Sequence, residues 1–398
     1  MFEWTEEQHA VCSSVRRFAQ RELRWRAHQL DTASPGTVDG DLLRQSCIFG
    51  LFSAQLPEDY GGTMDRLSAA IALEEIARWE AGIATLLAAN SLALLAVARS
   101  GNTALMQRMF ADVVAAEERQ EPLLWGLALT ERRAGSDLVH PTGVPGSRLM
   151  MTAKRHGDGY ILSGRKAYCA GGNLAAWLCV FATVSEDRSP AGLTGFVLPT
   201  STPGFHVSDV LSTMGLRACP LVEFYLENVY VPATDLLTKE GGATALVQEL
   251  SAYGRCQGAA IAVGIARGAF ELARQHSLIR EQGGSPLVHH QMVQQMLADM
   301  ATQIEAARLL THKAAMTDPP DVVLSSMAKV FASDAAVRIT TDAVQIMGAY
   351  GTTTKSGAEK YFRDAKMTQL FEGTNEICRL AITAPLLQYA GQGVIGSD

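Results

Sequence analysis

The chain has 398 residues, of which 47% are apolar and 19% are charged, and its formal net charge is −7. This length fits two to three domains, and the large apolar share excludes a disordered chain. The mildly acidic balance argues against a nucleic-acid-binding protein, because such proteins carry a basic excess. The small number of charges also predicts that part of the surface is covered by other subunits.

Targeting segments and cysteine clusters are not apparent in the sequence. We see no uncharged apolar stretch of about 18 residues, so we expect no membrane span. The N-terminal residues lack the apolar core and cleavage site of a secretory signal. The seven cysteines are scattered, without a C-x-x-C pair. We therefore expect a cytoplasmic protein with reduced, buried thiols, without disulfides and without a metal site.

Residues 1–122 are predicted to form an all-α N-terminal domain. Thr5 is followed by two glutamates and is typical of a helix N-cap, and apolar residues then recur at helical spacing. Asp39 predicts the start of a second helix, which should end at Gly50. Residues 67–98 are rich in alanine and leucine, which predicts helices buried on most sides.

The fold class expected from the whole chain is α+β, in the order helices, strands, helices. Residues 123–235 are predicted to form a central β-barrel domain, because short β-type runs alternate there with turns. The expected strands cover residues 123–130, 150–155, 160–163, 177–183, 195–198 and 222–230. Residues 236–398 are predicted to form a C-terminal helical bundle. Its expected helices cover residues 243–281, 288–315, 322–347 and 355–371.

Two segments of the middle region combine polar or aromatic residues with glycine. Residues 129–137 form a polar loop after a strand, which is either an ordinary surface loop or a binding site for a heterocycle or a phosphate. In residues 163–173, Tyr168 precedes a Gly-Gly pair. This pattern fits either a tight turn with a core tyrosine or an aromatic wall against a flat ring.

Two further segments follow in the C-terminal region. Arg280 and Gln291, with the glycine-containing segment 345–351, suit a pyrophosphate, although a cation such as Arg280 is also favoured at a helix end for electrostatic reasons alone. Glu372 lies between an apolar pair and a glycine. It is either part of a capped helix end or a carboxylate in a partly apolar pocket, where burial would make it a usable base. Dinucleotide-binding, Walker, zinc-protease and nucleophile-elbow motifs are absent from the sequence.

Several motifs, taken in their order along the chain, resemble the acyl-CoA dehydrogenase family. The resemblance covers essentially the whole chain, and the co-linear set of motifs is more specific than any one of them. The matching segments are Thr5–Gln8, Leu56–Gly62, Thr130–Glu131, Ala134–Asp137, Met214–Arg217, Val229–Pro232, Gln345–Gly348, Arg363–Lys366 and Phe371–Ile377.

The resemblance implies a flavoenzyme with non-covalently bound FAD and a helical, a β-barrel and a four-helix-bundle domain. It implies that Glu372 takes the α-proton of an acyl thioester while the β-hydrogen leaves as hydride to flavin N5. The backbone NH of the base and a ribityl hydroxyl of FAD would polarise the thioester carbonyl, as in an oxyanion hole. Some relatives carry the base on an earlier helix, and the matching position here is Gly254.

The resemblance also carries over binding residues. It implies an FAD site shared between subunits, and hence a homodimer or homotetramer. The implied FAD contacts are Leu127, Leu129, Thr130, Ser136, Tyr168, Ala170, Arg280, Gln291, Gln345, Ala349, Thr374 and Glu376. The implied substrate contacts are Ser136, Arg255 and Gly373. The substrate would be an acyl thioester, and the electron acceptor an electron-transfer flavoprotein or oxygen.

The chain departs from the family pattern at several positions. Ala170 stands where a hydroxyl residue usually meets flavin N5, so one hydrogen bond to the flavin is lost. Leu127 and Gly283 replace aromatic residues. Arg132–Arg133 replaces a Pro-Gly pair, and Cys219–Leu221 replaces a polar pattern after Arg217.

These departures suggest a biosynthetic member of the family that acts on an acyl group tethered to a carrier protein. Arg132, Arg133 and Arg217 would contact the acidic carrier or its phosphopantetheine. Because the whole chain is acidic, such docking would depend on this local arginine patch. Two alternatives are a flavin-dependent monooxygenase on the same fold and a catalytically silent homologue.

Overall fold

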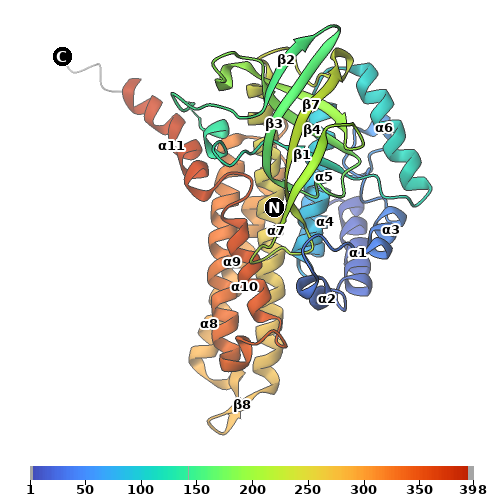
Figure 1. Cartoon of the computed structure of the whole chain (residues 1–398). Coiled ribbons are helices and arrows are strands. Elements are labelled where there is room, and N and C mark those ends of the chain that lie inside the picture. Colours follow the sequence, from blue (N-terminus) through green and yellow to red (C-terminus); the bar gives the residue numbers. More distant parts are fainter. Residues whose placement is uncertain (1–2, 142, 393–398) are drawn as a thin grey trace, which may run out of the picture.

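The structure, a computed structural model, describes residues 3–141 and 143–392, with side chains as far as residue 387. Helices at both ends of the chain enclose a central β-region (Figure 1). The N-terminal helices pack beside a long C-terminal bundle, and the sheet lies at one end of both. This arrangement confirms the predicted fold class. The boundaries after residues 122 and 235 stay predictions.

The N-terminal region is helical, as expected. Thr5 caps α1, because its side chain accepts a hydrogen bond from Gln8 N while Gln8 Oε1 accepts one from Thr5 N. Asp39 caps α3 through Leu42 N at 2.9 Å. The helices are α1 (Glu6–Glu22), α2 (Ala27–Thr32), α3 (Gly40–Ile48), α4 (Arg66–Ala77), α5 (Ala81–Ala98) and α6 (Thr103–Glu118).

Helix α5 is an exception to the expectation that no uncharged apolar stretch reaches about 18 residues. Its 18 residues, Ala81–Ala98, are long and apolar enough to cross a membrane. However, 78% of this segment is buried inside the protein. The helix contacts α4, α7 and the first strand. Packing against these elements accounts for the apolar composition, because a helix that is apolar on all sides suits the core of a large protein.

The central region forms one curled seven-stranded sheet. Its order is β1-β4-β2-β3-β7-β6, and β5 also pairs with β4. The β1–β4 pair is parallel, whereas β3–β7, β6–β7 and β4–β5 are antiparallel. The strands are β1 (Trp125–Ala128), β2 (Thr152–His156), β3 (Gly159–Ala170), β4 (Trp177–Thr183), β5 (Leu193–Pro199), β6 (Phe205–Leu211) and β7 (Leu221–Pro232).

The strand predictions were wrong at two places. Strand β6 was not expected, because it is an edge strand with mostly exposed and partly polar residues, which leaves no apolar alternation to detect. Strand β3 was expected to end at Ser163 but continues to Ala170. Register shifts next to Gly164 and between Lys166 and Cys169 interrupt its pairing with β7, and such bulges hide a strand from pattern reading.

The C-terminal helices form the predicted bundle. Helices α7, α8, α9 and α10 pack on one another, and α11 packs on α9 and projects outwards from the end of the bundle nearer the sheet (Figure 1). A hairpin of β8 (Glu281–Gln282) and β9 (Ser285–Pro286) connects α7 to α8. The helices are α7 (Ala243–Ile279), α8 (Gln291–Ala315), α9 (Val322–Gly351), α10 (Ala358–Thr368) and α11 (Asn375–Gln392). Short 3₁₀ helices are η1 (Glu58–Tyr60), η2 (Ser136–Val139), η3 (Pro190–Gly192), η4 (Ala233–Asp235) and η5 (Leu287–His289).

The cysteines are buried, as the sequence predicted. All seven are buried, and none of them forms a disulfide. Within residues 3–141 and 143–392, no group of three or more His, Cys, Asp or Glu side chains is arranged to hold a metal ion. The seven thiols therefore contribute to packing in the interior.

Candidate active site

Glu372 lies in the short connection between α10 and α11, against helix α7. Its backbone is left-handed, with φ of 55°, and that of Gly373 is left-handed too, with φ of 83°. Two glycines of α7 leave space for this connection. A Cβ atom at Gly254 would lie 2.0 Å from Glu372 Oε2, and one at Gly258 would lie 3.3 Å from the Phe371 ring. The Glu372 carboxylate thus occupies space that a side chain at position 254 would fill.

The surroundings of Glu372 act on its pKa in opposite directions. The residue is partly accessible to solvent, but its carboxyl group is packed inside the protein. Burial raises the pKa of Glu372 above its ordinary value, and the positive charges of Lys329 and Arg255 oppose this rise. A buried carboxyl group with a raised pKa, on a residue that is partly accessible to solvent, has the properties of a general base. The structure therefore favours the pocket interpretation of Glu372 over the helix-end interpretation.

Arg255 and Gly373, both predicted substrate contacts, lie beside Glu372. A Cβ atom at Gly373 would lie 3.7 Å from Arg255 Nη2. Arg255 is only 1% exposed, and its Nη1 donates to Ser326 Oγ at 3.0 Å. Its buried Nε has no hydrogen-bond partner among the described residues. The third predicted substrate contact, Ser136, starts η2, which packs on α7.

The residues predicted to surround the flavin ring converge from two neighbouring segments. Leu127, Leu129 and Thr130 lie in β1 and just after it, and Tyr168 and Ala170 lie at the end of β3. Backbone bonds join these segments, since Ala167 N donates to Thr130 O at 3.0 Å. A buried ion pair between their side chains joins the two segments as well.

A buried ion pair fixes the loop after β1. Lys166 Nζ lies 2.9 Å from Glu131 Oε1, and the two side chains are 0% and 1% exposed. Lys166 Nζ also donates to Leu129 O at 2.7 Å, and Glu131 accepts from Met151 N at 3.1 Å. This loop is therefore anchored inside the protein, which argues against the ordinary surface-loop interpretation.

The exposure of Tyr168 distinguishes between the two interpretations of residues 163–173. The side chain is 55% exposed, so it is no core tyrosine, and its φ is 55°. The nearby Leu127 and Leu129 are only partly buried. An exposed aromatic ring beside partly exposed leucines suits a flat heterocycle. The residues on this side of the sheet therefore fit the isoalloxazine ring of FAD.

The other predicted FAD contacts lie elsewhere. Arg280 follows α7 and Gln291 begins α8, next to the β8–β9 hairpin, while Gln345 and Ala349 lie in the last turns of α9. The His276 and Tyr350 rings stack at 6.0 Å and bring the ends of α7 and α9 together. Figure 1 shows this hairpin at the end of the bundle away from the sheet. A single chain therefore does not bring the two groups of FAD contacts together.

Thr374 and Glu376, the last two predicted FAD contacts, begin α11 directly after the Glu372–Gly373 turn. Thr374 Oγ1 accepts a hydrogen bond from Ile377 N at 3.4 Å. Glu376 is exposed. Bonds to its own backbone NH and to Thr374 lower its pKa, so it is ionised at neutral pH. These two residues are thus placed beside the candidate base.

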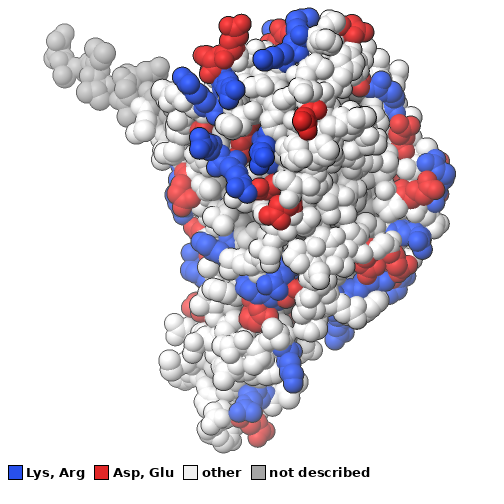
Figure 2. All heavy atoms as spheres, in the orientation of Figure 1, with Lys and Arg blue, Asp and Glu red and all other residues white. Residues whose placement is uncertain are grey.

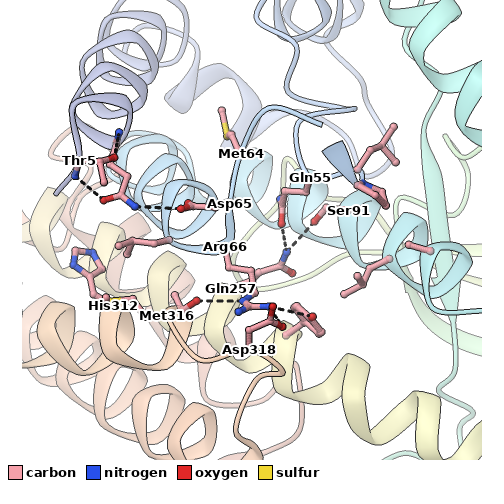
Figure 3. Close-up of a pocket in the computed structure, with 18 of the residues that line it drawn as sticks. Thr5, Gln55, Met64, Asp65, Arg66, Ser91, Gln257, His312, Met316 and Asp318 are labelled. Atoms are coloured by element: carbon pink, nitrogen blue, oxygen red, sulfur yellow. Dashed lines mark hydrogen bonds and ion pairs between the residues drawn. The ribbon is translucent and has the colours of Figure 1, made fainter. Parts of the chain in front are cut away.

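A cavity of about 630 Å³ lies on a neighbouring face of α7, between the N-terminal helices and the end of α8 (Figure 3). Gln257 forms part of its wall and donates to Ser91 Oγ at 2.8 Å and to Gln55 Oε1 at 3.1 Å. At another part of the lining, Arg66 donates to Asp318 Oδ1 at 2.8 Å. None of the predicted site residues lines this cavity, and several of its polar side chains bond to one another.

The sequence interpretation missed one charged residue beside Glu372. Lys329 is 0% exposed and donates to the Gly373 carbonyl at 2.7 Å and to Asn375 Oδ1 at 2.8 Å. The available signal was a lone lysine between Ala328 and Val330 in an apolar stretch of α9. A fully buried lysine must satisfy its ammonium group inside the protein.

Three family models of known proteins match the chain. Domain models described as the acyl-CoA dehydrogenase N-terminal, middle and C-terminal domains match residues 5–117, 126–229 and 241–387. These segments together cover most of the chain. They follow the helix–sheet–helix order of the structure.

Individual relatives match over nearly their whole length. Cyclohex-1-ene-1-carbonyl-CoA dehydrogenase of Geobacter metallireducens is 39% identical over 389 residues, which are 96% of this chain and 98% of that protein. The structure of butyryl-CoA dehydrogenase from Megasphaera elsdenii superposes with a TM-score of 0.89 at 32% identity, over 97% and 100% of the two chains. The prolyl acyl carrier protein oxidase AnaB superposes with a TM-score of 0.86 at 27% identity, over 96% and 100%. The chain therefore belongs to the acyl-CoA dehydrogenase family of FAD-dependent oxidoreductases that act on CH–CH groups.

Proposed function

We propose that this protein catalyses the FAD-dependent α,β-dehydrogenation of an acyl thioester, with Glu372 as the base. One observation carries the proposal: the Glu372 carboxyl occupies the space left by Gly254, with Arg255 and Lys329 as neighbouring cations. FAD, when bound, supplies the acceptor for the β-hydrogen at its N5 atom. The chain itself supplies the base and the enclosure around it.

The proposed reaction balances as a proton transfer with a hydride transfer. Glu372 takes the α-proton, and the electron pair of that C–H bond forms the new α,β double bond. The β-hydrogen leaves with its own electron pair. The Glu372 backbone NH would donate to the thioester carbonyl, which makes the α-proton more acidic. The positive charge of Arg255 favours the carboxylate form that is needed before proton transfer.

The relatives' substrates suggest what to test first. Cyclohex-1-ene-1-carbonyl-CoA and butyryl-CoA, from the names of two relatives, are a cyclic and a short linear acyl-CoA. Each is mixed anaerobically with the holoenzyme while the flavin absorbance is recorded. We expect a suitable acyl thioester to bleach the flavin. If neither these thioesters nor their carrier-bound counterparts bleach it, the proposed activity is wrong.

A carrier-bound acyl group is a second candidate substrate, favoured by the similarity to a prolyl acyl carrier protein oxidase. Two of the three arginines on which this candidate depends already contact other residues of the chain. Arg132 pairs with Glu223 at 2.6 Å, and Arg217 donates to the Asp31 carbonyl at 3.1 Å. Arg133 is exposed, and its side chain forms no hydrogen bond or ion pair with the described residues. Figure 2 shows basic and acidic side chains interspersed on the face turned towards the viewer, with several basic ones gathered in its upper left.

Arg133→Glu is expected to slow flavin reduction by a carrier-bound acyl group about 10-fold, because a like charge would then face the acidic carrier. Reduction by the same acyl group on CoA should change less than about twofold. Arg44→Glu, at an exposed arginine on α3, is the matched control and should affect neither substrate. Turnover of the acyl-CoA at a rate equal to or above that of the carrier-bound form would contradict the carrier hypothesis.

We also propose a homodimer or homotetramer in which each FAD contacts two chains. The support is the separation of the two groups of predicted FAD contacts within one chain (Figure 1). Further proposals from the sequence are a cytoplasmic location, a biosynthetic role, and an electron-transfer flavoprotein or oxygen as electron acceptor.

Arg280→Ala is expected to weaken FAD retention about 10-fold or more, because a charge-assisted hydrogen bond to the pyrophosphate contributes roughly 1.5–3 kcal/mol. The measurement is FAD binding to the apoprotein, with the oligomeric state recorded by light scattering. Arg274→Ala, on an exposed part of the same helix, is the control. Equal FAD affinity of the Arg280 and Arg274 variants would remove Arg280 from the FAD site.

A further inference from the structure

Lys329 of α9 is a buried cation for which the proposed reaction has not yet assigned a role. Its side chain is 0% exposed. Both of its hydrogen-bond acceptors, the Gly373 carbonyl at 2.7 Å and Asn375 Oδ1 at 2.8 Å, are uncharged. Burying an ammonium group away from a paired carboxylate is costly. Such a cost is typical of functional sites rather than of simple packing.

The hydrogen bonds of Lys329 hold the turn that carries Glu372. Glu372 and Gly373 are consecutive left-handed residues, and this conformation is unfavourable for a glutamate. Lys329 binds the carbonyl at the end of this turn, and its second acceptor, Asn375, lies two residues further along the chain. Asn375 is in turn held by α9, since its Nδ2 donates to Ser333 Oγ at 2.9 Å and to Asp334 Oδ1 at 2.8 Å. Helix α9 thus fastens the turn through a connected polar network.

The charges around the turn come from three helices. Glu372 feels the positive charges of Lys329 on α9 and Arg255 on α7. Lys329 in turn feels Glu372, Asp334 on its own helix, Arg255, and Cys378 on α11. Burial lowers the pKa of Lys329 to about 8, whereas a guanidinium keeps its proton throughout the working pH range. Of the two cations beside Glu372, Lys329 is therefore the one whose charge can be removed by a substitution of similar length.

We propose that Lys329 is a positioning residue for the reaction: its ammonium group fixes the Glu372–Gly373 turn through the Gly373 carbonyl and places a positive charge beside the base. This inference rests on the proposed function, because it assumes that Glu372 is the base. It adds a residue that contacts neither substrate nor FAD in that proposal. Its effect is expected in the rate of proton abstraction rather than in substrate binding.

The test compares Lys329→Met with Ser333→Ala. The methionine removes the charge at similar length, whereas the alanine disturbs the same network around Asn375 without changing any charge. For Lys329→Met, the acid limb of the pH profile of flavin reduction should move to higher pH by about one to three units, the range for losing a nearby opposite charge. For Ser333→Ala it should stay in place. Lys329→Arg should return the limb towards the wild-type position.

A second readout does not depend on turnover. The carboxyl group of Glu372 is titrated in the substrate-free holoenzyme by carbon NMR with labelled glutamate, and its signal is assigned by its loss in Glu372→Gln. The titration midpoint should rise in Lys329→Met by the same amount as the acid limb. If Lys329→Met does not fold, Lys329→Gln replaces it, because the amide still donates to the Gly373 carbonyl but carries no charge.

The outcomes separate this inference from the function on which it rests. An unchanged acid limb and an unchanged Glu372 midpoint in the uncharged Lys329 variants would overturn the inference. An equal shift in Ser333→Ala would also overturn it, because the network rather than the charge would then be responsible. If wild-type flavin is not reduced by any acyl thioester while the Glu372 midpoint still shifts, the proposed function is wrong and the electrostatic role of Lys329 stands.

Discussion

Glu372→Gln is expected to lower the rate of flavin reduction by an acyl thioester by about 10²- to 10⁴-fold, which is the usual contribution of a general base to a rate. Glutamine has nearly the same shape as glutamate and fits the space opposite Gly254, but its amide cannot take up the α-proton. FAD binding should therefore be retained. The measurement is anaerobic stopped-flow mixing with the thioester that bleaches the wild-type flavin.

The control for this experiment is Glu186→Gln. Glu186 is an exposed residue between β4 and β5, away from the predicted site, and its substitution should leave the bleaching rate within about twofold of wild type. Bleaching that survives Glu372→Gln at the wild-type rate would show that another group takes the proton. Retained hydroxylation of a substrate by this variant with a reductase would instead favour the monooxygenase alternative.

Gly254→Ala is expected to cost about 10² or more in the same rate, although it adds only one methyl group. The new Cβ would lie 2.0 Å from Glu372 Oε2, a separation that packed atoms do not tolerate. Helix α7 is long and buried at this point, so the carboxylate must move rather than the helix. A displacement of the base by about 1 Å suffices for a loss of this size. The measurement is stopped-flow reduction, together with thermal unfolding.

Gly258→Ala is the matched control, one helical turn further along the same helix. Its Cβ would lie 3.3 Å from the Phe371 ring, a contact that a few tenths of an ångström can relieve. It should reduce the rate only a few-fold and shift the unfolding temperature by about as much as Gly254→Ala. Similar rates for the two variants would mean that the space at position 254 does not position the base.

The sequence predicted local structure best where the signal is short-range. Thr5 and Asp39 cap helices because each side chain bonds a backbone NH three residues ahead, which needs no tertiary partner. The helix–strand–helix order also follows from periodicity over short windows. The polar edge strand β6 and the bulged half of β3 escaped, since their residues lack the alternation that burial on one face imposes.

The candidate site shows the same division. The sequence and its resemblance to a family predicted Glu372 as the base and the FAD residues around Tyr168. They also predicted that position 254, a glycine, offers no rival base. Only the packing shows that Gly254 makes room for Glu372, that Arg255 is enclosed beside Gly373, and that Lys329 binds the turn. No spacing along the chain predicts them, because these residues come from different helices.

The sequence by itself thus determined the order of elements, the family and the identity of the proposed base, since each is written in local patterns or in their co-linear order. Its composition also predicted a large core and covered surfaces. Only the tertiary structure decided which charges surround Glu372 and which of the arginines are already paired. Electrostatic free energies depend on distance and burial, and both are set by the packing of α7, α9 and the α10–α11 connection around one carboxyl group.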